Sequence, residues 1–104
     1  MKGAQIMFTR AVHPGQILRG ELEDLAVTAS EFARQIAVPP NRVSQILAGK
    51  RAVTGDTALR FGHWFGTDPQ FWLNLQAQYD LAAADKAVGP AIRDLPTKDT
   101  ARAA

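Results

Sequence analysis

The stretch TASEFARQIAVPPNRVSQILAGKR, residues 28–51, decides how this chain folds. It begins with Thr28, and Glu31 follows three residues later. This spacing is typical of a capping box, in which the hydroxyl accepts from the third helical amide and the carboxylate reaches back to the cap residue. The stretch is therefore predicted to open with a helix over 29–36. The buried face of that helix would comprise Phe32, Ala33 and Ile36.

A tight turn follows this helix. Val38 precedes two prolines, and a residue before proline is pushed out of the α region, so the first helix ends here. A second helix is predicted to begin at Pro39 or Pro40, to reach Ala48 and to stop at Gly49, where a left-handed cap residue belongs. Two short helices joined by a turn of about three or four residues form a helix-turn-helix unit. The second helix would bury Val43, Ile46 and Leu47.

The other side of the second helix carries short amide and hydroxyl side chains. A helical wheel at about 100° per residue separates them from the buried side chains. Asn and Gln can pair with the edge of adenine, and Arg with that of guanine, so this face is suited to reading DNA bases. The basic residues just past the helix are suited to phosphate contacts. The exposed set comprises Asn41, Ser44, Gln45 and Ala48, with Arg42 on the flank and Lys50 and Arg51 beyond.

Positive charge is concentrated in the same part of the chain. The whole chain of 104 residues carries a formal net charge of +2. Residues 28–53 carry +3, whereas residues 54–85 carry −3. This asymmetry favours an anionic partner for the helix-turn-helix unit, although chance clustering in a small protein would give the same pattern.

Three further helices are predicted, and no strand pattern is present. One runs over 14–26, with a proline in its first turn and an apolar stripe of Ile17, Leu18, Leu22 and Leu25. Another starts after Thr54 and ends at Gly66. The last opens with Asp68 and ends near Ala84 or Lys86.

Six of the eight aromatic residues fall between residues 61 and 79. Two helices of a small domain cannot easily bury all six, and Trp and Tyr are enriched at contacts between proteins. We therefore expect a homodimer interface in this region. The division of these side chains between core and interface stays open. The interface candidates are Trp64, Trp72, Leu75 and Tyr79.

Residues 13–81 resemble the HigA/VapI family of XRE-type helix-turn-helix antitoxins. The resemblance runs through HPGQILRGELEDL, the helix-turn-helix unit and AGKRAVTGDTALRFGHWFGTDPQFWLNLQAQYDL. It implies an all-α, five-helix domain of the lambda-repressor-like type over 13–86. An N-terminal arm, residues 1–12, would precede the domain and a mobile tail, residues 87–104, would follow it.

The resemblance also implies a function. The protein would be the antitoxin of a type II toxin–antitoxin system, a homodimer that binds double-stranded operator DNA and represses its own operon. It would neutralise a RelE-like, mRNA-cleaving toxin. By the same resemblance, the positions that read operator bases are Pro40, Asn41, Arg42, Ser44 and Gln45. The positions that contact the DNA backbone are Thr28, Lys50 and Arg51.

Two residues depart from the family pattern. Ala37 stands in the turn where the family usually has glycine, and a non-glycine residue at positive φ would cost about 1 kcal/mol. Gly62 stands inside a helix where alanine is commoner, at a similar cost of roughly 1 kcal/mol. Neither departure removes a proposed DNA contact.

Other classes of function are not expected. The chain has no cysteine, and His13 and His63 have no second ligand at metal-binding spacing, so no metal or other cofactor is expected. No nucleophile lies near a recognisable base, and no glycine-rich phosphate loop is present, so the chain does not look like an enzyme. No apolar run approaches the roughly 20 residues that span a membrane. A cytoplasmic protein is expected, nucleoid-associated when bound to DNA.

Two alternatives for the whole chain remain. It could be a stand-alone XRE-type regulator without a toxin, or a helical interaction module without a DNA role. The tail, residues 87–104, could be a plain disordered end or a segment that binds the toxin.

Overall fold

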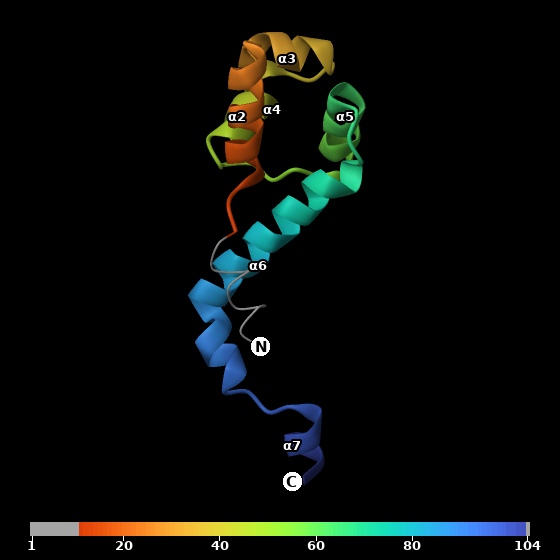
Figure 1. Cartoon of the computed structure of the whole chain (residues 1–104). Coiled ribbons are helices and arrows are strands. Elements are labelled where there is room, and N and C mark those ends of the chain that lie inside the picture. Colours follow the sequence, from red (N-terminus) through yellow and green to blue (C-terminus); the bar gives the residue numbers. More distant parts are fainter. Residues whose placement is uncertain (1–10, 104) are drawn as a thin grey trace.

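The computed structural model describes residues 11–103, and every element in that range is helical (Figure 1). The predicted all-α fold with five helices is confirmed, and a short sixth helix follows it. The predicted arm, residues 1–12, lies almost entirely outside the described residues. The helices are α2 (Pro14–Leu25), α3 (Ala29–Gln35), α4 (Pro40–Leu47), α5 (Gly55–Phe65), α6 (Pro69–Arg93) and α7 (Lys98–Ala103).

The last long helix extends further than predicted. We expected it to end near Ala84 or Lys86, but α6 runs for 25 residues to Arg93 and contains Pro90. The first residues of the predicted tail are therefore helical. The first half of α6 packs against α5 and α2, and its second half extends away from the body (Figure 1). No helix in the described range is long and apolar enough to cross a membrane.

The core is an aromatic cluster that joins the helix-turn-helix unit, α3 and α4, to the last two long helices. The Phe32 ring of α3 is fully buried and packs against the rings of Phe61, Trp64 and Phe65, with centroid distances of 5.4, 5.0 and 5.7 Å. Phe61 in turn packs edge-on against Trp72 of α6, at 5.0 Å. The aliphatic side chains that close the core are Leu18, Leu22, Ile36, Val38, Val43, Ile46 and Val53.

The His-Pro-Gly sequence at residues 13–15 starts α2 and brings it close to α4. His13 caps the helix, and its Nδ1 accepts from the backbone N–H of Gly15 at 2.9 Å. A Cβ on Gly15 would lie 1.9 Å from the backbone oxygen of Ile46, so only glycine allows α2 and α4 to approach this closely. His13 is thus the N-cap residue of α2.

The turn between α3 and α4 forms without glycine. Ala37 has a φ of 60°, as its place in the turn predicted. The backbone N–H groups of Ala37 and Val38 donate to Arg34 and Ala33 at 3.2 and 3.0 Å, and the side chain of Val38 is buried. The packed turn therefore absorbs the cost of about 1 kcal/mol for a non-glycine residue at positive φ. Gly49 and Gly66 have φ of 73° and 74° at the predicted helix ends.

Some local predictions were wrong. Leu25 was assigned to the apolar stripe of its helix but is 51% exposed, because it is the last residue of α2 and lies beyond the buried Leu18 and Leu22. The capping box at α3 is only half formed. Thr28 accepts from the Glu31 N–H at 3.1 Å, but the Glu31 carboxylate bonds Arg34 and Gln35 instead of the cap residue.

Gly62 is explained by a close approach rather than by helix propensity. A Cβ at this position would lie 2.8 Å from the backbone oxygen of Thr67 and 3.0 Å from Pro69. The turn between α5 and α6 therefore folds directly over the residue that lacks a side chain.

The contact at Gly15 predicts opposite effects for two glycine substitutions in α2. Gly15→Ala forces α2 and α4 apart and should lower the free energy of unfolding by about 3 kcal/mol, the upper end of typical overpacking costs. Gly20→Ala meets nothing within 4 Å and should raise it by about 0.5–1 kcal/mol through helix propensity. Urea denaturation of both variants measures this. Equal effects at the two sites would contradict the close approach.

The burial of His13 predicts a pH dependence of stability. Loss of solvent lowers the pKa of His13 from 6.5, and this outweighs Asp80 and the Arg51 backbone, which act in the opposite direction. The unfolded chain then binds the proton more readily. Stability should therefore be complete above pH 6.5 and fall as the pH drops towards the lowered pKa, by at most about 1.4 kcal/mol per pH unit.

This decline can be measured by denaturation between pH 7.5 and 5.5. His13→Asn keeps a capping oxygen without a titratable ring and should flatten the decline. The control, His63→Gln, changes an exposed histidine and should leave it in place. An unchanged slope in His13→Asn would refute the assignment.

Candidate nucleic-acid interface

The second helix of the helix-turn-helix unit, α4, presents most of the predicted base-reading residues on one exposed side. Val43 and Ile46 are fully buried and fix the orientation of the helix. Pro40, Asn41 and Ser44 are exposed, whereas Arg42 and Gln45 are half-buried. The predicted set therefore lies on the side of α4 that faces away from the core, and Arg42 lies on its flank.

The helix begins without a side-chain cap. Pro39 occupies the N-cap position and Pro40 the first helical position, where a missing N–H costs nothing. The Ser44 hydroxyl donates to the Asn41 backbone oxygen at 3.2 Å, whereas the Asn41 side chain has no hydrogen bond within the described residues. The Asn41 amide is thus free to act as donor and acceptor.

The residues predicted to contact the DNA backbone lie just before α3 and just after α4. Lys50 and Arg51 are exposed in the loop that follows Gly49. The Lys50 N–H donates to the Gln45 backbone oxygen at 2.8 Å, which fixes the start of this loop against α4. Thr28 is exposed and caps α3. Its hydroxyl accepts from Glu31, so its hydrogen can still be donated to an external acceptor.

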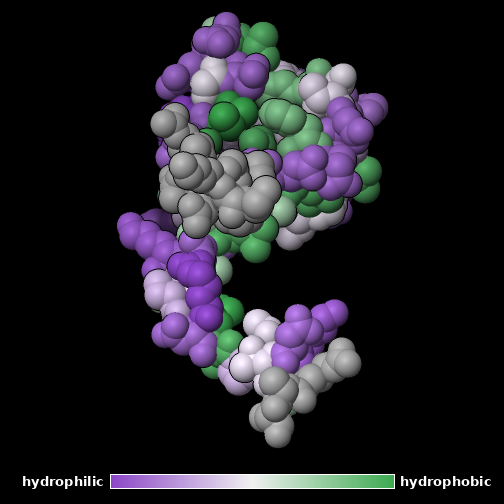
Figure 2. Space-filling view, turned by 60° about the horizontal axis from the view of Figure 1, so that its bottom comes forward, coloured by the Kyte–Doolittle hydropathy of each residue, from purple (hydrophilic) through white to green (hydrophobic). Residues whose placement is uncertain are grey.

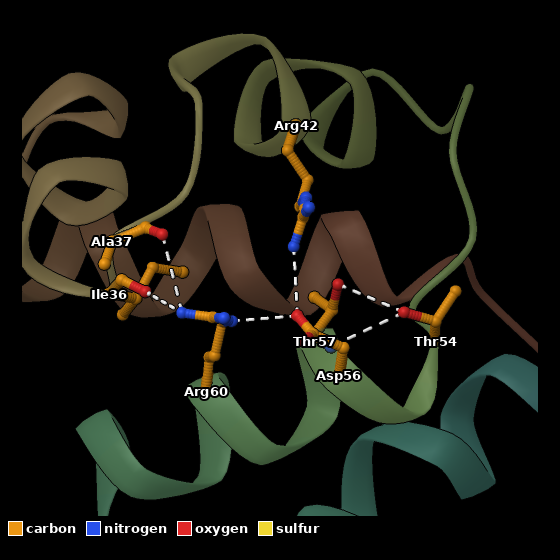
Figure 3. A network of polar contacts seen from close by, with 7 residues as sticks. All are labelled: Ile36, Ala37, Arg42, Thr54, Asp56, Thr57 and Arg60. Atoms are coloured by element: carbon orange, nitrogen blue, oxygen red, sulfur yellow. Dashed lines mark hydrogen bonds and ion pairs between the residues drawn. The ribbon is translucent and has the colours of Figure 1, made fainter.

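A network of charged side chains ties α4 to α5 and to the turn (Figure 3). One oxygen of the Asp56 carboxylate accepts from Arg42 at 3.0 Å and from Arg60 at 2.8 Å. Arg60 also donates to the backbone oxygens of Ile36 and Ala37, at 2.9 and 3.4 Å. The hydrogen bond from Arg60, together with the charges of both arginines, lowers the pKa of Asp56. The carboxylate therefore stays ionised near neutral pH.

Sequence reasoning missed this network and a second polar contact. No role in a network of this kind was predicted for Asp56 or Arg60. The buried amide of Gln76 accepts from the Val53 N–H at 2.8 Å and donates to Asp80 at 2.9 Å, which joins the loop after α4 to α6. The contacts across the fold join residues that are 14 to 24 positions apart, so no local spacing reveals them. Asp56–Arg60 and Gln76–Asp80, by contrast, have the i, i+4 spacing of neighbours on one helix face.

The predicted dimer residues lie in different environments. Trp72 is only 2% exposed and belongs to the core, so its assignment to an interface was wrong: its own chain already covers the ring. Trp64 is half-buried, and its Nε1 donates to Gln35 at 2.6 Å. Leu75 is half-buried against the core, and the half-buried Tyr79 ring packs edge-on against His13 at 4.9 Å.

Three of the four large exposed apolar side chains of α6 lie from its midpoint onward, and the fourth, Phe71, lies in its first turn. On a helical wheel these three fall on the side of α6 opposite Trp72 and Gln76. The hydropathy view shows hydrophobic side chains beside hydrophilic ones along this narrow part of the molecule (Figure 2). The exposed apolar residues on this side are Leu81, Val88 and Ile92 of α6, and Leu95 follows just beyond the helix.

Within residues 11–103, no group of three or more His, Cys, Asp or Glu side chains is placed to hold a metal ion. A shallow hollow adjoins the charged network, lined by Arg42, Arg51, Ala52, Thr54, Asp56 and Thr57. These side chains can donate hydrogen bonds to an anion and can form hydrogen bonds with the polar groups of a bound molecule. They lie on the same part of the surface as α4.

Comparison with known proteins identifies the family. No family model matches the chain. Virulence-associated protein I of Dichelobacter nodosus is 44% identical over 77 residues, which cover 73% of this chain and 71% of that protein. Among solved structures, a HigA-family addiction module antidote protein from Coxiella burnetii is 48% identical with a TM-score of 0.82, and the match covers 85% of this chain and 97% of that chain.

A further solved structure is the antitoxin HigA of Pseudomonas aeruginosa with the higBA promoter. It is 37% identical with a TM-score of 0.82, over 86% of this chain and 99% of that chain. Sequence and fold thus agree over more than two thirds of this chain. This chain belongs to the HigA/VapI family of XRE-type helix-turn-helix antitoxins.

Proposed function

We propose that this protein is a sequence-specific DNA-binding antitoxin that represses its own operon. The observation that carries the proposal is the exposed side of α4, which offers Asn41, Ser44 and Gln45 beside the basic loop at Lys50 and Arg51. The Pseudomonas relative, with the same fold, was solved with promoter DNA. Such a protein would act in the cytoplasm, on the nucleoid when bound to DNA.

Base recognition and contacts to the DNA backbone would be made by two different groups of residues. The amides of Asn41 and Gln45 can each donate to and accept from one adenine edge, and Arg42 can pair with guanine. Thr28, Lys50 and Arg51 would contact phosphates, which positions α4 without selecting a sequence. Pro40, at the exposed start of the helix, would lie closest to the groove floor.

The toxin partner is proposed to be a RelE-like, mRNA-cleaving protein. Membership of an antitoxin family supports a toxin partner of some kind, and the RelE-like class rests on the family resemblance alone. A stand-alone regulator is the alternative. Affinity purification of the tagged protein from its native host, followed by mass spectrometry, separates the two: a co-purified ribonuclease encoded beside this gene supports the antitoxin.

A homodimer is proposed to be held mainly by the second half of α6. Leu81, Val88 and Ile92 are 53%, 47% and 55% exposed on one side of the helix, and apolar side chains in such a stripe pack well against a second helix. Trp64, Leu75 and Tyr79, the other residues expected at the interface, keep part of their surface exposed. On a helical wheel Leu75 and Tyr79 fall on other sides of α6 than this stripe, so they would not take part in this contact. A second copy would remove the apolar stripe from water.

DNA binding should be steeply dependent on salt. If a dimer neutralises about six to eight phosphates, the log–log slope of affinity against salt should be roughly −5 to −7. Gln45→Ala should cost roughly 1–3 kcal/mol on a selected duplex and little on random DNA. Lys50→Ala should weaken both alike and flatten the slope. Fluorescence anisotropy titrations measure all three.

Gln70→Ala is the matched control, because Gln70 is exposed on α6, away from α4. This variant should bind as the wild type does. A slope near zero for the wild type would exclude the proposed function, and equal losses of Gln45→Ala on both duplexes would show that Gln45 only positions the protein.

The dimer proposal predicts that Val88→Asp dissociates the protein. Each copy would lose the burial of one valine, worth roughly 1.5–3 kcal/mol, and would place a charge in the contact. Sedimentation equilibrium should show a dissociation constant at least about tenfold higher. Ala87→Asp, on a neighbouring side of the same turn, should remain dimeric. If both variants stay dimeric, the contact lies elsewhere.

A further inference from the structure

The charged network suggests a role in DNA recognition for Asp56, which lies on α5 and not on the exposed side of α4. The Arg42 side chain begins on α4 but turns towards the start of α5, where Asp56 accepts from its Nη1 (Figure 3). The Arg42 side chain is 29% exposed and that of Asp56 58%. Arg42 is thus held against the body of the protein instead of extending into solvent.

The contact leaves one edge of the guanidinium available. Arg42 uses only Nη1 for Asp56 and makes no other side-chain hydrogen bond within the described residues. Its Nε and Nη2 therefore form a free pair of parallel donors. This is the geometry that pairs with the O6 and N7 acceptors of guanine. Arg42 also lines a hollow together with Arg51 and Thr54, which leaves space beside its side chain.

The carboxylate that holds Arg42 is itself fixed. The Nε of Arg60 donates to the same oxygen of Asp56 at 2.8 Å, and its Nη1 donates to the backbone oxygen of Ile36 at 2.9 Å. Asp56 therefore lies between two guanidinium groups, one of which is anchored on the turn before α4. An arginine with a fixed plane loses less conformational freedom when it binds, which favours selective over indiscriminate contacts.

We propose that Asp56 is a positioning residue for base recognition: it orients Arg42 so that the free Nε–Nη2 edge reads a guanine. The proposal rests on the proposed DNA-binding function and assigns a specificity role to a carboxylate. Without Asp56, Arg42 becomes a mobile cation that can bind any phosphate. Binding to random DNA would then be kept or improved, while binding to the preferred sequence is weakened.

The experiment uses a 30-bp duplex selected by the wild-type protein from a random library, with all single-base variants and a random-sequence duplex. Asp56→Asn should weaken binding to the selected duplex by about tenfold, the range of one bidentate base contact, and should not weaken binding to the random duplex. It should also remove the preference at one base pair, the same one that Arg42→Gln affects.

Two comparisons separate positioning from other roles. In the Arg42→Gln background, Asp56→Asn should have no further effect on the selected duplex. Asp85→Asn makes the same charge change and breaks an Asp–Arg pair of 2.7 Å with Arg93, but on the distal half of α6, so its base preferences should match those of the wild type. Circular dichroism checks that each variant is folded.

Several results would overturn the proposal. If Asp56→Asn raises the affinity for both duplexes equally, Asp56 only repels DNA. Weakening that persists in the Arg42→Gln background, or that affects all base variants alike, would mean a structural role or a phosphate contact. If the wild type shows no salt-dependent binding to any duplex, the proposed function fails first; if it binds and Arg42→Gln changes no base preference, only this inference fails.

Discussion

Burial of the Phe32 ring is the interaction on which the structure depends. This side chain projects from α3 into the rings of Phe61, Trp64 and Phe65, and so fixes the first helix of the motif against α5. The seven residues of α3 would not be stable as a helix alone, since isolated helices of this length are marginal in water. The position of α4, and with it the exposed amide side chains, follows from this aromatic contact.

Much of the fold is predictable because the signals that bound the helices are local. Prolines and Thr or Asp caps mark the starts of five helices, and glycines in the left-handed conformation mark the ends of α4 and α5. The positive φ of Ala37 follows from its place in the turn. The position of the predicted DNA-reading residues on one exposed side follows from helical periodicity alone. These features require no knowledge of what lies opposite each helix.

The features that sequence could not provide are contacts across the fold. The sequence shows that Trp72 and Leu59 are both apolar. It does not show that Trp72 is buried and Leu59 exposed, because that depends on how the helices pack. The pairing of Asp56 with Arg42 depends on where the fold places the start of α5 relative to α4. The end of α6 was misjudged because Gly89 and Pro90 lower helix propensity, yet the helix continues through both to Arg93.

The projecting half of α6 also affects how the molecule moves through solution. A compact chain of about 100 residues has a radius of gyration near 13 Å. This one has 17.5 Å, with extents of 59, 23 and 22 Å. An elongated particle experiences more friction than a sphere of equal mass. A single copy will therefore elute early from a gel-filtration column, as a heavier globular protein does, and its mass has to be determined by light scattering.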